Sequence, residues 1–304
     1  MLKRYSISLI VILFLSFIQI NCKGGQKDDE FVKIPDDINN VNQTVVDESA
    51  MNEIISSFSS PVEMAALMKS IDVPFSKKFL IDPKVTEDYD INYKKALALG
   101  ILSADLGYLN VYERTTLIVE YLTSIKKIAN DLNVGQFFDF QALKRIAAGG
   151  GDVDSLLFLS VTSFHDMDEH LRQNARSNLS LLVITGVWLE GLYLLTQVAE
   201  ENPTSKLQER IGEQKTLFNY LYPILKLYNE EKYFKDLTDD FDDFRKVFEE
   251  VTIRYVEGEV DTLIAENGSM TFIQNDYSVV EITEDQLKDI TKITDKVRNK
   301  LINL

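Results

Sequence analysis

Apolar residues recur every three to four positions through most of the chain, which is the spacing that places side chains on one face of an α-helix. A short helix is predicted over 62–71, followed by a connection over 73–89 that lacks this period but contains Phe79 and Ile81, which need burial. Thr283 has the spacing from a glutamine that makes a capping box at the start of the last helix. The main helices are predicted over residues 90–110, 115–134, 138–148, 155–172, 179–198, 207–228, 233–250 and 284–302.

The period shortens after Val251, where apolar residues between 260 and 282 predict a small β-hairpin. Its turn is expected at Asn267-Gly268 or near Asn275-Asp276. The predicted fold is therefore mainly α, a multi-helix bundle of about seven to nine helices with a small C-terminal β-hairpin. In this interpretation residues 49–304 form a single helical domain.

Residues 179–198 (LSLLVITGVWLEGLYLLTQV) are apolar all round rather than on one face, so we expect them to form the central helix of the bundle. The stretch is long enough to cross a membrane, but Glu190 and several glycines and threonines interrupt it. We therefore expect a buried helix rather than a membrane span.

The first residues of the chain have the three parts of a secretory signal peptide. Two basic residues precede an apolar run over 7–18, which is too short to cross the ~30 Å hydrocarbon core of a bilayer. The run ends shortly before Cys22, the only cysteine of the chain. This pattern predicts a signal peptide over 1–21 and a flexible acidic tether over 22–48. Two alternatives stay open, namely a cleaved signal peptide with an incidental cysteine and an uncleaved membrane anchor.

Cys22 stands where a bacterial lipoprotein carries the thiol that receives its lipid, and the residues before it resemble a lipobox. Asn21 and Gln19 occupy positions where most such proteins carry a small and an aliphatic residue. A run that resembles the export signal of Bacteroidota surface lipoproteins follows, at Gln26, Lys27, Asp28, Asp29 and Glu30. The chain thus resembles helical surface and outer-membrane lipoproteins of the Bacteroidota. The resemblance implies palmitate or another acyl chain on Cys22 and a location at the outer membrane or cell surface.

Acidic residues outnumber basic ones by 48 to 32, which gives a formal net charge of −16. This excess argues against nucleic acid and against an anionic bilayer as partners, because both need clustered Lys and Arg. The expected partners are a membrane, reached through lipid on Cys22, and an envelope protein complex.

Gly149, Gly150 and Gly151 are not followed by the Lys-Ser or Lys-Thr of a P-loop, and we expect no cofactor.

Four glycines lie inside two of the most apolar predicted helices, at positions 100, 107, 186 and 191. Glycine costs ~1 kcal/mol in a helix interior relative to alanine, so we expect these two helices to approach each other closely. Each helix also carries one acid among apolar neighbours, Asp105 or Glu190. The structural interpretation pairs these acids with an arginine or tyrosine, the candidates being Arg114, Arg145, Arg176, Tyr108 and Tyr193. The alternative is a catalytic pair, because glycosidases act through two carboxyl groups.

The histidines and the longest acidic run do not have the spacing of a metal site. His165 and His170 are five residues apart, which puts them about 140° apart around a helix, so they cannot share one ion as an i, i+4 pair would. The acids between Asp236 and Asp243 lack the glycine and the spacing of a calcium loop. We expect both groups on hydrated helix surfaces and no metal.

These observations favour a lipid-anchored envelope protein without catalytic residues, which works by binding or as an accessory subunit. The sequence contains no Gly-x-Ser-x-Gly motif, and no Ser or Cys nucleophile has a histidine beside it in a suitable pattern. The competing hypothesis is a surface glycan hydrolase that uses Asp105 and Glu190. A purely structural spacer is a third possibility.

Overall fold

The computed structural model describes residues 68–70, 72–146, 153–258, 260–264, 270–274 and 277–303. The chain divides into two units, Met1–Asn39 and Asn40–Leu304, and every described residue belongs to the second unit. The predicted signal peptide, the predicted tether and most of the predicted helix over 62–71 lie outside the described residues.

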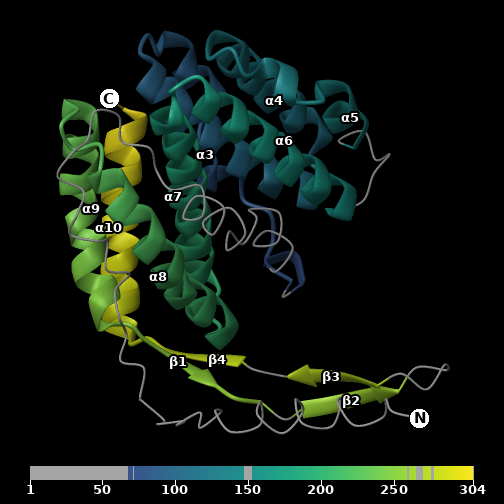
Figure 1. The fold of residues 1–304 in the computed structure, drawn as a ribbon, viewed down its shortest axis with the longest axis vertical. Coiled ribbons are helices and arrows are strands. Elements are labelled where there is room, and N and C mark those ends of the chain that lie inside the picture. The colour runs from purple at the N-terminus through teal and green to yellow at the C-terminus, as the bar shows by residue number, and fades with distance from the viewer. Residues whose placement is uncertain are drawn as a thin grey trace, which may run out of the picture. The chain divides into compact units, whose positions relative to one another are not determined.

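Eight α-helices run through the described part of the chain and are joined by short connections (Figure 1). They are α3 (Asn92–Val111), α4 (Thr115–Asp131), α5 (Phe140–Arg145), α6 (Val153–Gln173), α7 (Ser177–Glu201), α8 (Ser205–Lys226), α9 (Lys232–Glu250) and α10 (Glu284–Ile302). The connections contain three short 3-10 helices, η1 (Lys77–Phe79), η2 (Pro83–Asp88) and η3 (Gly135–Phe137). The predicted mainly α bundle is confirmed.

Local sequence signals set several helix ends, and one expectation about them is wrong. Thr283 and Gln286 form the predicted capping box, in which each side chain accepts a hydrogen bond from the other residue's backbone N–H. By contrast, α4 ends at Asp131 and does not continue to Gly135. Asn133 adopts a left-handed φ of 57° and its N–H bonds back to the last turn of the helix. Asparagine can end a helix in this way because its short polar side chain tolerates the left-handed conformation.

The predicted hairpin is present as an antiparallel ribbon in two paired sections (Figure 1). β1 (Thr252–Val256) pairs with β4 (Tyr277–Glu281), and β2 (Val260–Ile264) pairs with β3 (Met270–Gln274). The pairing of β2 with β3 fits a hairpin whose turn falls between these two strands, and both predicted turns, Asn267-Gly268 and Asn275-Asp276, lie outside the described residues. Within the described residues β4 also contacts α8, which joins the ribbon to the helices.

The most apolar helix, α7, lies at the centre of the bundle, as predicted. It contacts α3, α6, α8 and α10, and nearly all of its side chains are buried. Among the described residues, α7 is the helix that is long and apolar enough to cross a membrane, but 94% of its most apolar window is buried inside the protein. The apolar side chains of α7 therefore pack against neighbouring helices, as those of a core helix in a globular bundle do.

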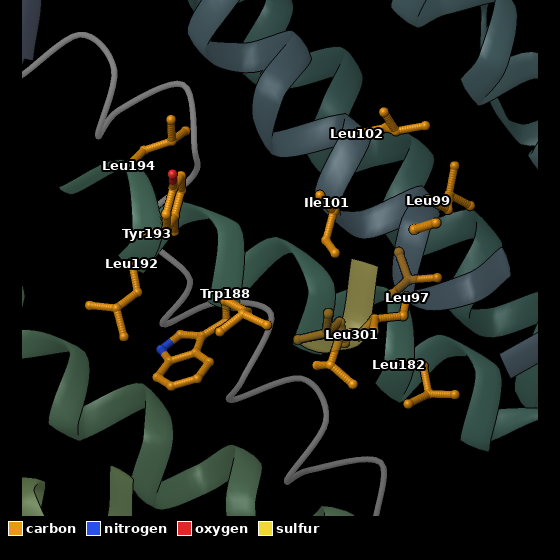
Figure 2. Close-up of a cluster of buried hydrophobic side chains, with 14 of the residues drawn as sticks. Leu97, Leu99, Ile101, Leu102, Leu182, Trp188, Leu192, Tyr193, Leu194 and Leu301 are labelled. Atoms are coloured by element: carbon orange, nitrogen blue, oxygen red, sulfur yellow. The ribbon is translucent and has the colours of Figure 1, made fainter. Parts of the chain in front are cut away.

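Two glycines let α3 and α7 touch through their backbones. A Cβ atom on Gly100 would lie 2.0 Å from the Val183 carbonyl oxygen, and a Cβ on Gly186 would lie 2.1 Å from the Leu97 carbonyl oxygen. Any larger residue at either position would force the helices apart, which confirms the close approach expected from the sequence. Around this contact, leucines and isoleucines from both helices fill the core (Figure 2).

Trp188 anchors a second part of the core on another side of α7. Its indole is directed toward α8 and α9 (Figure 2), where ring centroids lie 5.5 Å away at Phe218 and 5.3 Å away at Phe244. Phe241 and Phe248 complete the cluster. These rings are almost fully buried, so these aromatic residues of α8 and α9 serve packing.

We expect Gly100→Ala to lower the free energy of unfolding by about 2 kcal/mol or more, although alanine favours a helix by ~1 kcal/mol. The added methyl group meets backbone atoms of α7 that cannot turn aside. Urea denaturation followed by circular dichroism measures the change.

Gly212→Ala in α8 is the matched control. Its Cβ would meet Val280 Cγ1 at 2.3 Å, which is a side-chain atom rather than backbone. The loss at this position should be smaller. An equal loss in both variants would contradict the assignment of Gly100 to a backbone-to-backbone contact.

Candidate functional site

The two acids singled out from the sequence meet in the interior, together with an arginine of the last helix. Asp105 on α3 and Glu190 on α7 are both 0% exposed. Arg298 on α10 donates to Glu190 through two atoms, with Nε 2.9 Å from Oε2 and Nη2 2.6 Å from Oε1. This two-point geometry is the strongest that a guanidinium makes with a carboxylate, and it ties α7 to α10.

Asp105 lies beside this ion pair with one oxygen bonded and one free of donors. Its Oδ2 accepts the Ile81 N–H at 3.1 Å, whereas Oδ1 has no hydrogen-bond partner among the described residues. Burial raises the pKa of the Asp105 carboxyl well above its ordinary value, and the Glu190 carboxylate raises this pKa further. The Arg298 charge and the hydrogen bond from the Ile81 amide lower this pKa, but by less than burial and Glu190 raise it. The raised pKa means that Asp105 keeps its proton to higher pH than an exposed aspartate, and in that form its O–H can donate to the neighbouring Glu190.

The cluster satisfies backbone groups of the connection over 73–89, which covers it. Arg298 Nη2 donates to the Phe79 carbonyl oxygen at 3.1 Å, and the Tyr121 hydroxyl donates to the Ile81 carbonyl oxygen. With the bond from the Ile81 N–H to Asp105, three backbone groups of one irregular stretch are paired with buried side chains. A buried segment outside helices and sheets needs such partners, because unpaired backbone groups are costly away from water.

Sequence reasoning found both acids, but its three candidate arginines, Arg114, Arg145 and Arg176, did not include Arg298. Arg114 lies over the Phe75 ring, and Arg176 donates to the Leu132 carbonyl oxygen. Tyr193 does take part, because its ring lies 3.8 Å from the Arg298 guanidinium carbon. A usable signal for Arg298 existed, since it falls on the apolar stripe of α10 that contains Val297 and Leu301.

The arrangement suits a structural role better than chemistry on a substrate. A glycosidase needs carboxyl groups that reach the glycosidic bond and a water molecule. Glu190 is held by Arg298 at both oxygens, and neither acid has exposed surface through which a glycan could approach. The buried polar site is therefore a connector between α3, α7, α10 and the connection over 73–89.

The other candidates lie on helix surfaces. His165 is exposed, and His170 packs its ring 4.9 Å from that of Phe137. The acidic run of α9 is neutralised in part by α10, whose Lys300 pairs with Asp240 at 2.6 Å. Other lysines of α9 and α10 pair with further acids of the run: Lys232 with Asp236, Lys235 with Asp239, and Lys246 and Lys296 with Asp243. This run therefore helps to hold α9 and α10 together.

We expect Asp105→Asn to flatten the pH dependence of stability. Because the pKa of Asp105 is raised in the folded state, the unfolded chain releases this proton first, above pH ~3.9, so Asp105 lowers stability progressively as pH rises from that value toward its folded pKa. Asparagine keeps the acceptor for Ile81 and stays neutral. Thermal unfolding from pH 4 to 8 measures the slope.

Asp105→Leu is the control for this prediction. It removes both the titration and the acceptor for the Ile81 N–H, so its stability should lie below that of Asp105→Asn at every pH. An Asp105→Asn variant that keeps the wild-type slope would show that Asp105 is ionised in the folded protein.

Glu190→Gln should destabilise the protein by about 3–5 kcal/mol, because the Arg298 guanidinium would stay buried without a counter-charge. Denaturant unfolding measures the loss. Glu200→Gln is the matched control, since Glu200 is exposed on the same helix and should have little effect. A Glu190→Gln protein of normal stability would contradict the structural role of Glu190 and would favour the alternative of a catalytic pair.

The described residues thus bring Asp105, Glu190 and Tyr193 together and add Arg298 and Tyr121. Cys22 and the residues that resemble an export signal lie outside the described residues. Comparisons with protein-family models, with curated proteins and with solved structures find no match to this chain.

Proposed function

We propose that this chain is a lipid-anchored lipoprotein of the cell envelope, at the outer membrane or cell surface, with acyl chains on Cys22. The observation that carries the proposal is the place of the only cysteine, at the end of a short apolar run and before an acidic stretch. Each buried methylene of an acyl chain contributes ~0.8 kcal/mol, so two or more chains hold a protein stably at a bilayer.

The helical domain of this lipoprotein acts by binding, as an accessory subunit of an envelope protein complex. The geometry of the buried polar site supports this part of the proposal. Asp105 and Glu190, the acids that best suited catalysis, are used to hold the connection over 73–89 against the core. The alternative of a glycan hydrolase is not favoured, because it needs the same two acids to be accessible.

Cys22→Ala should release the protein from membranes if lipid on this residue is the anchor. The wild-type chain should stay in the membrane fraction after a high-salt wash and should incorporate labelled palmitate. The variant should do neither. Fractionation of cells that express each form, with labelling, measures both properties.

Asn21→Ala is the matched control, because it changes the neighbouring residue and leaves the thiol in place. A Cys22→Ala protein that remains in washed membranes would contradict the anchor. Purification of the acylated chain from its own membranes then tests the accessory role, since a subunit should bring its complex with it in a fixed ratio.

A further inference from the structure

Residues 73–81, called the clasp below, are attached to the bundle by side chains of the helices and not by a backbone ladder. In the described part of the chain, the backbone-to-backbone hydrogen bonds of this stretch stay local, as in the bonds from the Val73 N–H to Met68 and from the Leu80 N–H to Lys77. Lifting the clasp off the bundle would therefore break no backbone bond inside the described helices α3 to α10. Contiguous segments of this kind can open as cooperative units while the rest of a protein stays folded.

Within the described residues, five side chains of the bundle each bond one backbone group of the clasp. They come from α3 and its C-cap, from α4 and from α10, and are Asp105, Tyr108, Tyr112, Tyr121 and Arg298. The Ser76 N–H donates to the Tyr108 hydroxyl at 3.0 Å, and the Tyr112 hydroxyl donates to the Val73 carbonyl oxygen at 2.8 Å. Because all five groups are side chains, water can replace the clasp at each of them without disturbing the helix that carries it.

Asp105 is the attachment whose strength depends on its protonation. Its Oδ2 accepts the Ile81 N–H at 3.1 Å, and its Oδ1 has no hydrogen-bond partner among the described residues. A carboxylate oxygen without a partner is costly when it is buried away from water. When the clasp is lifted, water can reach and bond this oxygen. The ionised form of Asp105 is therefore less costly with the clasp open than with the clasp closed.

The other charged and titratable groups around Asp105 lie on α3, α4, α7 and α10, and are Tyr108, Tyr121, Glu190, Tyr193 and Arg298. Burial raises the pKa of all three tyrosines above its ordinary value, so they stay neutral up to pH 8. Burial lowers the pKa of Arg298, but the Glu190 carboxylate raises it by more, so Arg298 stays charged. Glu190 is held by Arg298 at both oxygens, in the geometry of an ionised carboxylate. Asp105 is therefore the group of this cluster whose charge can change as pH rises.

We propose that the clasp opens as a unit from the otherwise folded bundle when Asp105 loses its proton. Opening frees Phe79 and Ile81, which are 2% and 6% exposed in the closed form, and uncovers Glu190 and Arg298 beneath them. The domain thus presents one surface with the clasp closed and another with the clasp open. This switch goes beyond the proposed function and does not depend on the lipid anchor.

The direction of the pH effect follows from comparing the two forms. In the closed form, burial and the Glu190 charge raise the pKa of Asp105. In the open form, water reaches the carboxyl group and its pKa returns toward the ordinary value of ~3.9. Opening therefore becomes up to about tenfold more favourable per pH unit between these two values. Low pH keeps the clasp closed, and rising pH opens it.

Hydrogen exchange of the full chain carrying Cys22→Ser, followed by mass spectrometry from pH 5 to 8, tests the proposal. Exchange rates are expressed relative to an unstructured peptide, which removes the direct effect of pH on exchange. We expect the clasp to be less protected than α7 by about tenfold or more, and its protection to fall as pH rises. Low urea concentrations should speed exchange in α7 steeply and in the clasp only slightly, because opening exposes less surface than global unfolding does.

Two variants separate the role of Asp105 from that of the other attachments. Asp105→Asn should remove the pH dependence of clasp protection, since asparagine does not titrate and can still accept the Ile81 N–H. Tyr121→Phe removes the donor to the Ile81 carbonyl oxygen, so it should lower clasp protection at every pH and keep the pH dependence. Thr123→Val is the matched control, because Thr123 is exposed on the same helix and bonds the Val119 carbonyl oxygen of that helix. This control should change neither property.

Two results would overturn the proposal. Equal protection of the clasp and α7, with the same response to urea, would show that the clasp opens only when the whole domain unfolds. A pH dependence that persists in Asp105→Asn would show that another group controls opening. The first comparison needs no substitution among the described residues, so it does not depend on whether a variant folds. Neither measurement involves lipid, so this proposal and the proposed anchor fail separately.

Discussion

The buried ion pair between Glu190 and Arg298 is the interaction on which the interior of this protein depends. Charged groups that are buried away from water need a hydrogen-bond partner at every oxygen and N–H. Removing one partner of a buried ion pair destabilises the folded state by several kcal/mol. The structure meets this demand by drawing α10, α3 and the connection over 73–89 onto α7. The buried ion pair thereby fixes the relative positions of α3, α7, α10 and the connection over 73–89.

The same interior is built on close contact between α3 and α7. Gly100 and Gly186 remove the side chains that would separate the two backbones, so these helices pack more closely than leucine faces permit. This proximity brings Asp105 next to Glu190 and excludes water from both. Burial and the neighbouring Glu190 charge together raise the pKa of Asp105, because a second buried negative charge beside Glu190 is costly. The close contact of α3 with α7 therefore determines both the packing of the core and the raised pKa of Asp105.

The division between interior and surface has a functional meaning. The acids that suggested catalysis are used to hold the fold, whereas the features that suit contact with other molecules lie outside. On the surface, the α9 acids are bound to lysines of α9 and α10, and Lys126 of α4 lies over the Phe140 ring of α5. The proposed binding function therefore depends on the surface of the helical domain, because the buried acids are already used inside the fold.

The sequence by itself determined the helical class, most helix bounds, the central place of α7 and the close approach at the glycines. These properties follow from the spacing of apolar residues and from the helix propensity of each residue. Both depend only on residues that are close together in the chain. The sequence also marked Asp105 and Glu190, because an acid inside an apolar run is visible without coordinates. Only the tertiary structure decided that Arg298 of α10 is their partner and that lysines of α10 pair with acids of α9. Those contacts join residues of different helices, and their distances depend on how the helices pack rather than on any local pattern.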